Sequence, residues 1–165
     1  MRLRRLFRHL FTTSLHAHRC FPTHALNAIE QEIRSSEARH GGEIRFAIEI
    51  ALEGPTLWQN LSPRQRALDV FARLRVWDTA RRNGVLIYLL LADRDVEIVA
   101  DRGFDGLVTQ AEWEGACLVM EAQLRAGRYK EGAIAGIHAL SALIERHFPP
   151  EPREVNELPN RPVIL

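Results

Sequence analysis

The sequence lacks the features of a secreted, membrane-spanning or nucleic-acid-binding protein. It has only two cysteines in 165 residues, and Cys20 and Cys117 are too far apart to suggest a disulfide framework. A reducing compartment is therefore expected. No apolar run approaches the roughly 20 residues that a membrane-spanning helix needs. The net charge of +1 gives no overall field that would attract nucleic acid. We expect one cytoplasmic domain without a nucleic-acid partner.

Motifs that bind organic cofactors or activate a nucleophile are absent as well. The sequence contains no P-loop, no Gly-x-Ser-x-Gly elbow and no calcium loop of the EF-hand type. It also shows no pairing of a nucleophile with a base. No organic cofactor is therefore expected, and the sequence alone does not decide whether the protein is an enzyme.

The first 21 residues form a basic amphipathic segment. In "MRLRRLFRHLFTT" the leucines and phenylalanines recur at helical spacing, with most arginines on the other side. No small-residue cleavage site follows, so no signal peptide is predicted. Residues 1–11 are expected to contact an anionic membrane surface, which would make the protein peripheral at the inner membrane. The alternative is a frayed tail or a helix folded back on its own domain.

Residues 22–148 alternate between helices and strands. Two helices are expected to begin with capping boxes, at Ser62 and at Thr109. Helices are predicted at about 23–39, 62–78, 109–126 and 129–147, and strands at 43–51, 85–92 and 96–100. This order predicts an α/β fold, a three-layer α/β/α sandwich of the Rossmann-like kind with a small mixed sheet.

The connections predict how the strands pair. The first two strands are joined through a helix and are expected to be parallel. Only "ADRD" separates the second strand from the third, which predicts an antiparallel β-hairpin. The first strand alternates, so Glu43 and Glu49 are expected to face solvent. The Pro-rich tail at 149–165 is predicted to be extended, and its last four residues are expected to pair with a sheet edge, its own or a partner's.

Small polar residues gather where the two hairpin strands begin and end. If the turn centres near Asp93 and Arg94, paired residue numbers sum to about 187, and Asn83 meets the end of the third strand. Asp78 ends the preceding helix, and Asp105 lies just beyond the hairpin. Carboxylate and amide oxygens are the ligands that Ca²⁺ and Mg²⁺ prefer. The pattern predicts a divalent-ion site made of Asp78, Asn83, Asp101 and Asp105.

Charged residues near this end of the hairpin are candidates for phosphate contacts or for supporting the ion ligands. Arginine suits bidentate contacts with phosphate oxygens, which points to Arg81, Arg82 and Arg102. Parallel pairing of the first two strands brings His40 and Glu43 to the same end of the sheet. The alternative is that all of these residues form turns and a solvated helix end.

Two stretches of the chain carry a family resemblance. The first is "NGVLIYLLLADRDVEIVADRGF", and the second is "GRYKEGAIAGIHAL", with a Gly-x-Tyr-x-x-Gly step at Gly127, Tyr129 and Gly132. With the helix between them they resemble the TPM domain family over about residues 22–148. The "NELPNRPVIL" ending is similar to a short bacterial subgroup without a signal peptide or glycine-rich tail. The family includes a thylakoid lumen acid phosphatase and photosystem II repair proteins.

The resemblance implies a Rossmann-like sandwich. It also implies a divalent ion near the start of the Asn-Gly strand, with calcium as the first candidate. Asn83 is at the matching position. Many members carry an acidic residue just before this asparagine, where this chain has Arg82. Arginines here would weaken a bare-cation site and strengthen a phosphate site.

Two functions fit the sequence. The first is a protein-interaction module, stabilised by Ca²⁺ or Mg²⁺ and held near a membrane by its N-terminal segment, with an unidentified protein partner. The alternative is a metal-dependent, acid-phosphatase-like hydrolase of phosphomonoesters. The ion would then lie at the Asp101 end of the hairpin, and the neighbouring arginines would hold phosphate oxygens.

Overall fold

A mixed four-stranded sheet forms the centre of the computed structural model, which describes residues 9, 14–52, 61–150 and 155–165. Its strand order is β3–β2–β1–β4. β1 and β2 are parallel, and β2 and β3 are antiparallel. The predicted mixed sheet and hairpin are therefore confirmed. The strands are β1 (Glu43–Glu49), β2 (Gly84–Leu90), β3 (Asp95–Ala100) and β4 (Val163–Ile164).

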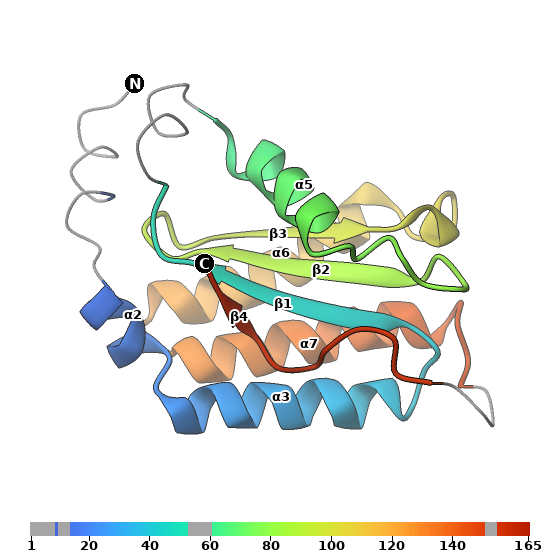
Figure 1. Ribbon diagram of the computed structural model, residues 1–165, viewed down its shortest axis with the longest axis horizontal. Coiled ribbons are helices and arrows are strands. Elements are labelled where there is room, and N and C mark those ends of the chain that lie inside the picture. Colours follow the sequence, from blue (N-terminus) through green and yellow to red (C-terminus); the bar gives the residue numbers. More distant parts are fainter. Residues whose placement is uncertain (1–8, 10–13, 53–60, 151–154) are drawn as a thin grey trace.

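Helices cover both faces of this sheet (Figure 1). α5 (Pro63–Arg73) lies on one face, while α3 (Thr23–Glu37), α6 (Gln110–Arg125) and α7 (Tyr129–Glu145) cover the other. A short helix, α2 (Ser14–Cys20), precedes α3, and a 3₁₀ turn, η1 (Arg102–Phe104), follows β3. The α/β sandwich predicted from the order of elements is confirmed.

Alternate residues of β2 supply the two cores. Leu86 and Tyr88 pack with Val70 under α5, whereas Ile87 and Leu89 belong to the larger cluster on the opposite face. All seven residues of β2 are buried, as expected for a continuous apolar strand covered on both sides. Both predicted capping boxes are present at the starts of α5 and α6.

The hairpin has a register different from the one predicted. Val85 pairs with Ala100, so paired numbers sum to 185 and not to about 187. The reason lies in the turn. After Leu90 the backbone N–H groups of Leu91 and Ala92 donate to the carbonyls of Glu49 and Ile50, at 2.9 and 3.1 Å, and the turn centres one residue earlier, at Ala92 and Asp93. A shift of two residues in the sum keeps every side chain on its predicted face.

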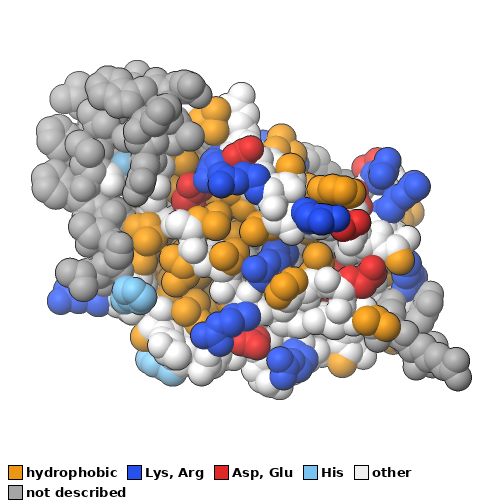
Figure 2. All heavy atoms as spheres, viewed as in Figure 1, with side chains coloured by type: hydrophobic (Ala, Val, Ile, Leu, Met, Phe, Trp, Pro, Cys, Tyr) orange, Lys and Arg blue, Asp and Glu red, His pale blue; other side chains and the backbone are white. Residues whose placement is uncertain are grey.

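β1 is buried on both faces, and the prediction that its acidic residues face solvent is wrong. Glu43 and Glu49 are each only 7% exposed. Side chains and backbone groups from other parts of the chain cover them, as described below. Figure 2 shows the face that carries α5, where basic and acidic side chains are interspersed.

The end of the chain closes one edge of the sheet. Val163 of β4 pairs in parallel with Ala47 of β1, and the N–H of Leu165 donates to the carbonyl of Ile48 at 2.9 Å. The predicted pairing of the tail with its own sheet is confirmed.

The predicted N-terminal membrane segment falls mostly outside the described residues. Of residues 1–11 only His9 is described. Within the described part of the chain no helix is long and apolar enough to cross a bilayer.

Candidate functional site

Glu43 of β1, Gly84 of β2 and Asp101, the residue after β3, lie in one row at the amino end of β1 and β2. Glu43 pairs with Gly84, and the N–H of Asp101 donates to the carbonyl of Gly84 at 2.9 Å. Neighbours across a sheet place their side chains on the same face. The two carboxylates therefore flank a residue that has no side chain.

The backbone of the segment after α5 lies against Gly84, in the space that a side chain at this position would occupy. A Cβ atom on Gly84 would lie 1.9 Å from the carbonyl oxygen of Val76. No residue other than glycine fits here without moving one of the two chains. The result is a concentration of oxygen atoms, with one carbonyl above Gly84 and a carboxylate on each side.

Asp101 is buried, and one of its oxygens is unsatisfied. The residue is 7% exposed and caps η1, with Oδ1 accepting a hydrogen bond from the N–H of Arg102 at 2.8 Å. Within the described part of the chain, the buried Oδ2 atom has no hydrogen-bond partner. Burying a carboxylate oxygen without a donor is costly, so this atom is a candidate ligand for a cation.

Glu43 is bound by the C-terminal segment. Its Oε2 atom accepts a hydrogen bond from the N–H of Leu158 at 3.0 Å, and its own N–H donates to the carbonyl of Asn83 at 3.1 Å. Glu43 therefore connects β1 to the C-terminal segment and to the residue before β2. The sequence placed Glu43 at this end of the sheet but gave no sign of the contact with Leu158.

Asn83 holds the loop before β1 in place. Its Nδ2 group donates to the carbonyl of Gly41, and its backbone N–H donates to Oγ1 of Thr79 at 3.1 Å. The side chain is 3% exposed, and Oδ1 is without a partner among the described residues. The amide therefore has a structural role already.

His40 lies in the same loop as a neutral imidazole. Its Nδ1 atom accepts a hydrogen bond from the N–H of Gly42 at 3.2 Å, and burial lowers its pKa to about 4. In the neutral ring the proton is then on Nε2, which is buried and has no partner in the part of the chain described. A histidine in this state is neither a ready base nor a cation at neutral pH.

A cavity of about 360 Å³ opens next to His40. Glu37 faces it, and burial, followed by the nearby charge of Glu43, raises the pKa of Glu37 to about 8 against the lowering effect of two hydrogen bonds. Those hydrogen bonds come from the N–H of Ile44, at 2.8 Å from Oε1, and from the side-chain amide of Asn160. Glu37 is therefore mostly protonated at neutral pH. The cavity lining also includes Arg34, Ala38, Gly42 and Asn156.

The predicted acidic residues do not all gather here. Asp78 is exposed and forms an ion pair with Arg75 at 2.6 Å, and Asp105 is exposed beyond η1. Across the described ranges no group of three His, Cys, Asp or Glu side chains is arranged to hold a metal ion. Any cation at this end would depend on Asp101, Glu43 and backbone oxygens.

The predicted arginines lie near the row of Glu43, Gly84 and Asp101 and are not part of it. The guanidinium carbon of Arg81 lies 5.4 Å from the ring centroid of Phe148. Arg82 is exposed with a φ of 54°, and its carbonyl accepts a hydrogen bond from Gly103 at 3.0 Å. Arg102 is also exposed. These side chains give the rim a positive charge that suits an anionic group.

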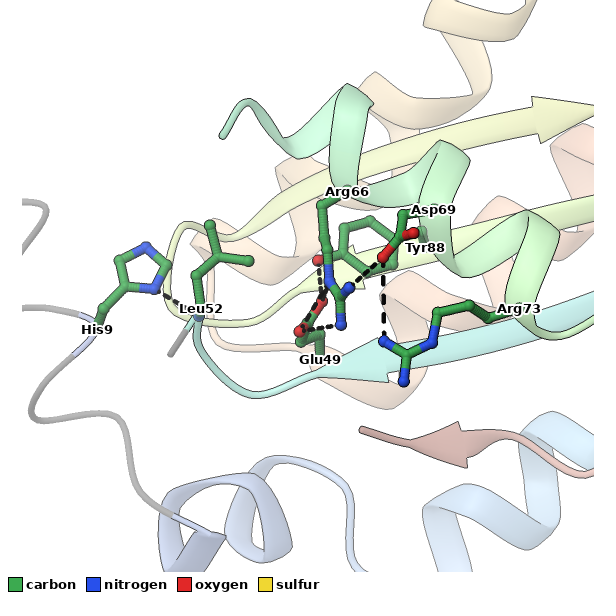
Figure 3. A network of polar contacts seen from close by, with 7 residues as sticks. All are labelled: His9, Glu49, Leu52, Arg66, Asp69, Arg73 and Tyr88. Atoms are coloured by element: carbon green, nitrogen blue, oxygen red, sulfur yellow. Dashed lines mark hydrogen bonds and ion pairs between the residues drawn. The ribbon is translucent and has the colours of Figure 1, made fainter. Parts of the chain in front are cut away.

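A second polar network lies at the opposite end of β1, and it was not predicted (Figure 3). Arg66 of α5 binds Glu49 through two nitrogens, Nε at 2.8 Å from Oε2 and Nη2 at 2.9 Å from Oε1. The hydroxyl of Tyr88 donates to the same carboxylate. Nearby, Nδ1 of His9 accepts a hydrogen bond from the N–H of Leu52 at 2.9 Å. Because both Glu49 oxygens have donors, this network is structural.

Comparisons with known proteins agree with this architecture. The BA42 protein of the psychrophilic bacterium Bizionia argentinensis, solved by NMR, is 29% identical with a TM-score of 0.77, over 88% of this chain and 95% of that one. The N-terminal domain of a P. gingivalis protein is 18% identical with a TM-score of 0.60, covering 75% of this chain and 76% of that one. The N-terminal domain of the cg2496 protein of Corynebacterium glutamicum is 14% identical with a TM-score of 0.53, covering 74% and 72%. These last two similarities concern the fold alone.

No curated protein matches the chain. The model of the TPM domain family matches residues 20–143, which is most of the sequence and includes the row of Glu43, Gly84 and Asp101. The chain therefore belongs to the TPM domain family.

Proposed function

We propose that this TPM domain is a non-enzymatic interaction module that takes a divalent cation at the Asp101 end of the sheet. The buried Oδ2 atom of Asp101, without a donor among the described residues, carries the proposal. A hard cation would satisfy this oxygen directly. The carboxylate of Glu43, in the same row, and the carbonyl oxygen of Val76, which lies against Gly84, would be further oxygen ligands.

The proposed site is a weak one. Two carboxylates and a carbonyl leave several positions of the ion to water, and Arg82 and Arg102 add positive charge nearby. Affinity for Ca²⁺ rises with the number of charged ligands and the rigidity of the site. We therefore expect a dissociation constant on the order of 0.1–1 mM, the range of weak extracellular modules.

Two groups of the types that act as a base or a nucleophile, His40 and Cys117, are in states that favour an interaction role over catalysis. The pKa of His40 is lowered to about 4 by burial, and the pKa of Cys117 is raised to about 12 by burial and by the charge of Glu97. Neither group is charged or activated at neutral pH. The cation would instead fix the turn after β3 and so present a rigid surface to a protein partner. Residues 1–11 would hold the domain near an anionic membrane.

Phosphomonoester hydrolysis is the second candidate, because Arg81, Arg82 and Arg102 flank the same end of the sheet. Arginine binds phosphate oxygens through paired hydrogen bonds. In that case the cation and the arginines would hold the phosphate together.

Calorimetric titration of the metal-stripped protein with Ca²⁺ and with Mg²⁺ tests the proposal. Asp101→Asn removes the charge but keeps an oxygen for the N–H of Arg102, and Asp105→Asn is the matched control on an exposed carboxylate. We expect saturable binding in the parent and in the control, and none in Asp101→Asn. Calcium should also raise the melting temperature of the parent and not of Asp101→Asn.

Equal binding in all three proteins would contradict the proposed site. A parallel assay with p-nitrophenyl phosphate separates the two functions. Steady turnover that needs both the ion and Asp101 would replace the interaction module by the hydrolase.

A further inference from the structure

The outer edge of β3 is held by side chains in place of a neighbouring strand. β3 is at one end of the sheet that the described residues form. The backbone N–H of Val96 donates to Oε1 of Glu121 at 3.3 Å, and the carbonyl of Ile98 accepts from Arg64. Both are alternate residues whose backbone groups point away from β2. Side chains on flexible stems thus occupy positions that strand pairing would otherwise fill.

A groove of about 450 Å³ runs along this edge. Arg64, at the start of α5, forms one wall, and α6 forms the other. Its apolar part comes from α6, where Leu118 is 60% exposed and Trp113 and Cys117 are half-buried. The groove therefore runs beside the outer edge of β3 and offers apolar surface on the α6 side.

The charge of the groove is unbalanced. Four carboxylates line it, and among the described residues two guanidinium groups pair with them: Arg64 lies 3.6 Å from Glu97, and Arg125 forms an ion pair with Glu121. Burial raises the pKa of Glu97, so this carboxylate would be stabilised by a further cation. The four acidic residues are Asp95, Glu97, Glu114 and Glu121.

The two sides of the groove differ in chemistry. Asp95 and Glu97 alternate with Val96 and Ile98 along β3, so the acidic side chains face the α5 side and the apolar ones face α6. An added strand would likewise alternate between these sides. Basic residues would lie over Glu97, and apolar residues would lie against Leu118 and the neighbouring ring of α6.

We propose that the outer edge of β3 docks an extended segment of a partner protein in which basic and apolar residues alternate, added as a further strand of the sheet. Arg64 now makes two of the contacts that such a segment would make, to Glu97 and to the carbonyl of Ile98. A second copy of this chain does not fit, because pairing two such edges would bring eight carboxylates together against four arginines. The site is separate from the Asp101 end and needs no cation.

The probe is a blocked peptide of about six residues, a usual strand length, with alternating lysine and valine. It is titrated by calorimetry and by amide chemical shifts, with a chelator present so that no divalent ion contributes. We expect saturable binding with shifts confined to 95–100 and the groove side of α6. A peptide of the same sequence with N-methylated backbone amides on its pairing edge is the control.

Two variants are expected to change the affinity for the peptide in opposite directions. Glu97→Gln with Glu114→Gln removes two charges and should weaken binding at least about tenfold, which corresponds to about 1.4 kcal/mol. Arg64→Ala frees the carbonyl of Ile98 and the carboxylate of Glu97, so it should strengthen binding about threefold or more. A purely structural role for Arg64 would leave the affinity unchanged or lower it.

Three outcomes would overturn the proposal. The first is no binding up to millimolar peptide in either the parent or Arg64→Ala. The second is equal binding of the N-methylated peptide, which would show that only charge is recognised. The third is a set of shifts spread over the whole surface.

Discussion

Arg66 binds Glu49 through both arms of its guanidinium, with Nε 2.8 Å from Oε2 and Nη2 2.9 Å from Oε1. This pair connects α5 to the end of β1 beneath a largely solvent-excluded surface, since the two side chains are only 12% and 9% exposed. The hydroxyl of Tyr88 completes the set of donors. Removing one partner would leave the other buried without compensation.

We predict that Arg66→Met lowers the free energy of unfolding by about 3 kcal/mol, because the Glu49 charge then lacks its partner. Adding Glu49→Gln should recover at least half of this loss, since the neutral amide can still accept from Tyr88. Urea denaturation measures both changes. Arg73→Met is the control, because this exposed arginine lies 4.0 Å from Asp69 and should change stability by less than about 0.5 kcal/mol. A small effect of Arg66→Met would mean that the pair contributes little.

Two glycines should respond in opposite ways to the same substitution. A Cβ on Gly84 would lie 1.9 Å from the Val76 carbonyl oxygen, whereas Gly115, inside α6, has nothing within 4 Å of that position. Gly84→Ala should therefore cost about 3 kcal/mol or prevent folding. Gly115→Ala should stabilise by about 0.5–1 kcal/mol, because alanine favours the helix. Thermal unfolding of the two variants decides this, and tolerance of Gly84→Ala would mean that the segment after α5 moves easily.

Glu37 should make stability fall as the pH rises. Its pKa is about 8 in the folded chain against an ordinary 4.5, so between these values the folded state holds a proton that the unfolded state has released. The free energy of unfolding should decrease through this window by up to about 1.4 kcal/mol per pH unit. Glu37→Gln should remove this slope and be more stable than the parent at pH values above about 8.

The titration of His40 changes the free energy of unfolding in the opposite direction at lower pH. Its pKa is about 4 in the folded chain against 6.5, so stability is lost as the pH falls through that range. The two effects act against each other between 4.5 and 6.5. In Glu37→Gln the acid-side loss should stand alone, and urea unfolding at a series of pH values measures it. A parent and a variant with identical pH profiles would contradict the assignment of Glu37, and a variant without the acid-side loss would contradict that of His40.

Cys117 should be unreactive in the folded protein. Burial raises its pKa to about 12, so the thiolate that reacts with iodoacetamide is scarce at pH 8. In a Cys20→Ser background, alkylation of the native protein should be about a thousandfold slower than in urea. Mass spectrometry of timed samples gives both rates. Rapid labelling without urea would show that α6 separates from the edge of β3.

Local patterns predicted most of the fold. The apolar run at Val85 to Ala92 gave the central strand, the capping boxes at Ser62 and Thr109 gave two helix starts, and the short "ADRD" connection gave the hairpin. These signals are local, because periodicity and capping depend on residues a few positions apart.

The burial of Glu43 and Glu49 could not be predicted in this way. Alternation in β1 indicated a solvent-facing side, but Leu158 and Arg66 cover these carboxylates from distant parts of the chain. The contact of Glu37 with Asn160 likewise joins residues 123 positions apart. Such pairings depend on tertiary packing, which local periodicity does not encode.

At the candidate site the sequence identified the correct end of the sheet for Asn83, Asp101 and Glu43, because the hairpin and the parallel pairing follow from connection lengths. It could not show that Asp78 pairs with Arg75 on the surface. The helix predicted to run to Asp78 ends at Arg73, so Asp78 lies in an irregular segment whose side-chain directions depend on neighbours that local patterns do not specify.

The position of β2 in the sheet determines how far the candidate site is affected by local unfolding. β2 is hydrogen-bonded to a strand on each side and buried along its whole length. We therefore expect its amide hydrogens to exchange with solvent only when the entire domain unfolds, and those of the two-residue β4 to exchange through local fraying. Asn83 and Gly84 begin β2, so this end of the sheet is attached to the most slowly exchanging element and keeps its geometry while the edges open and close.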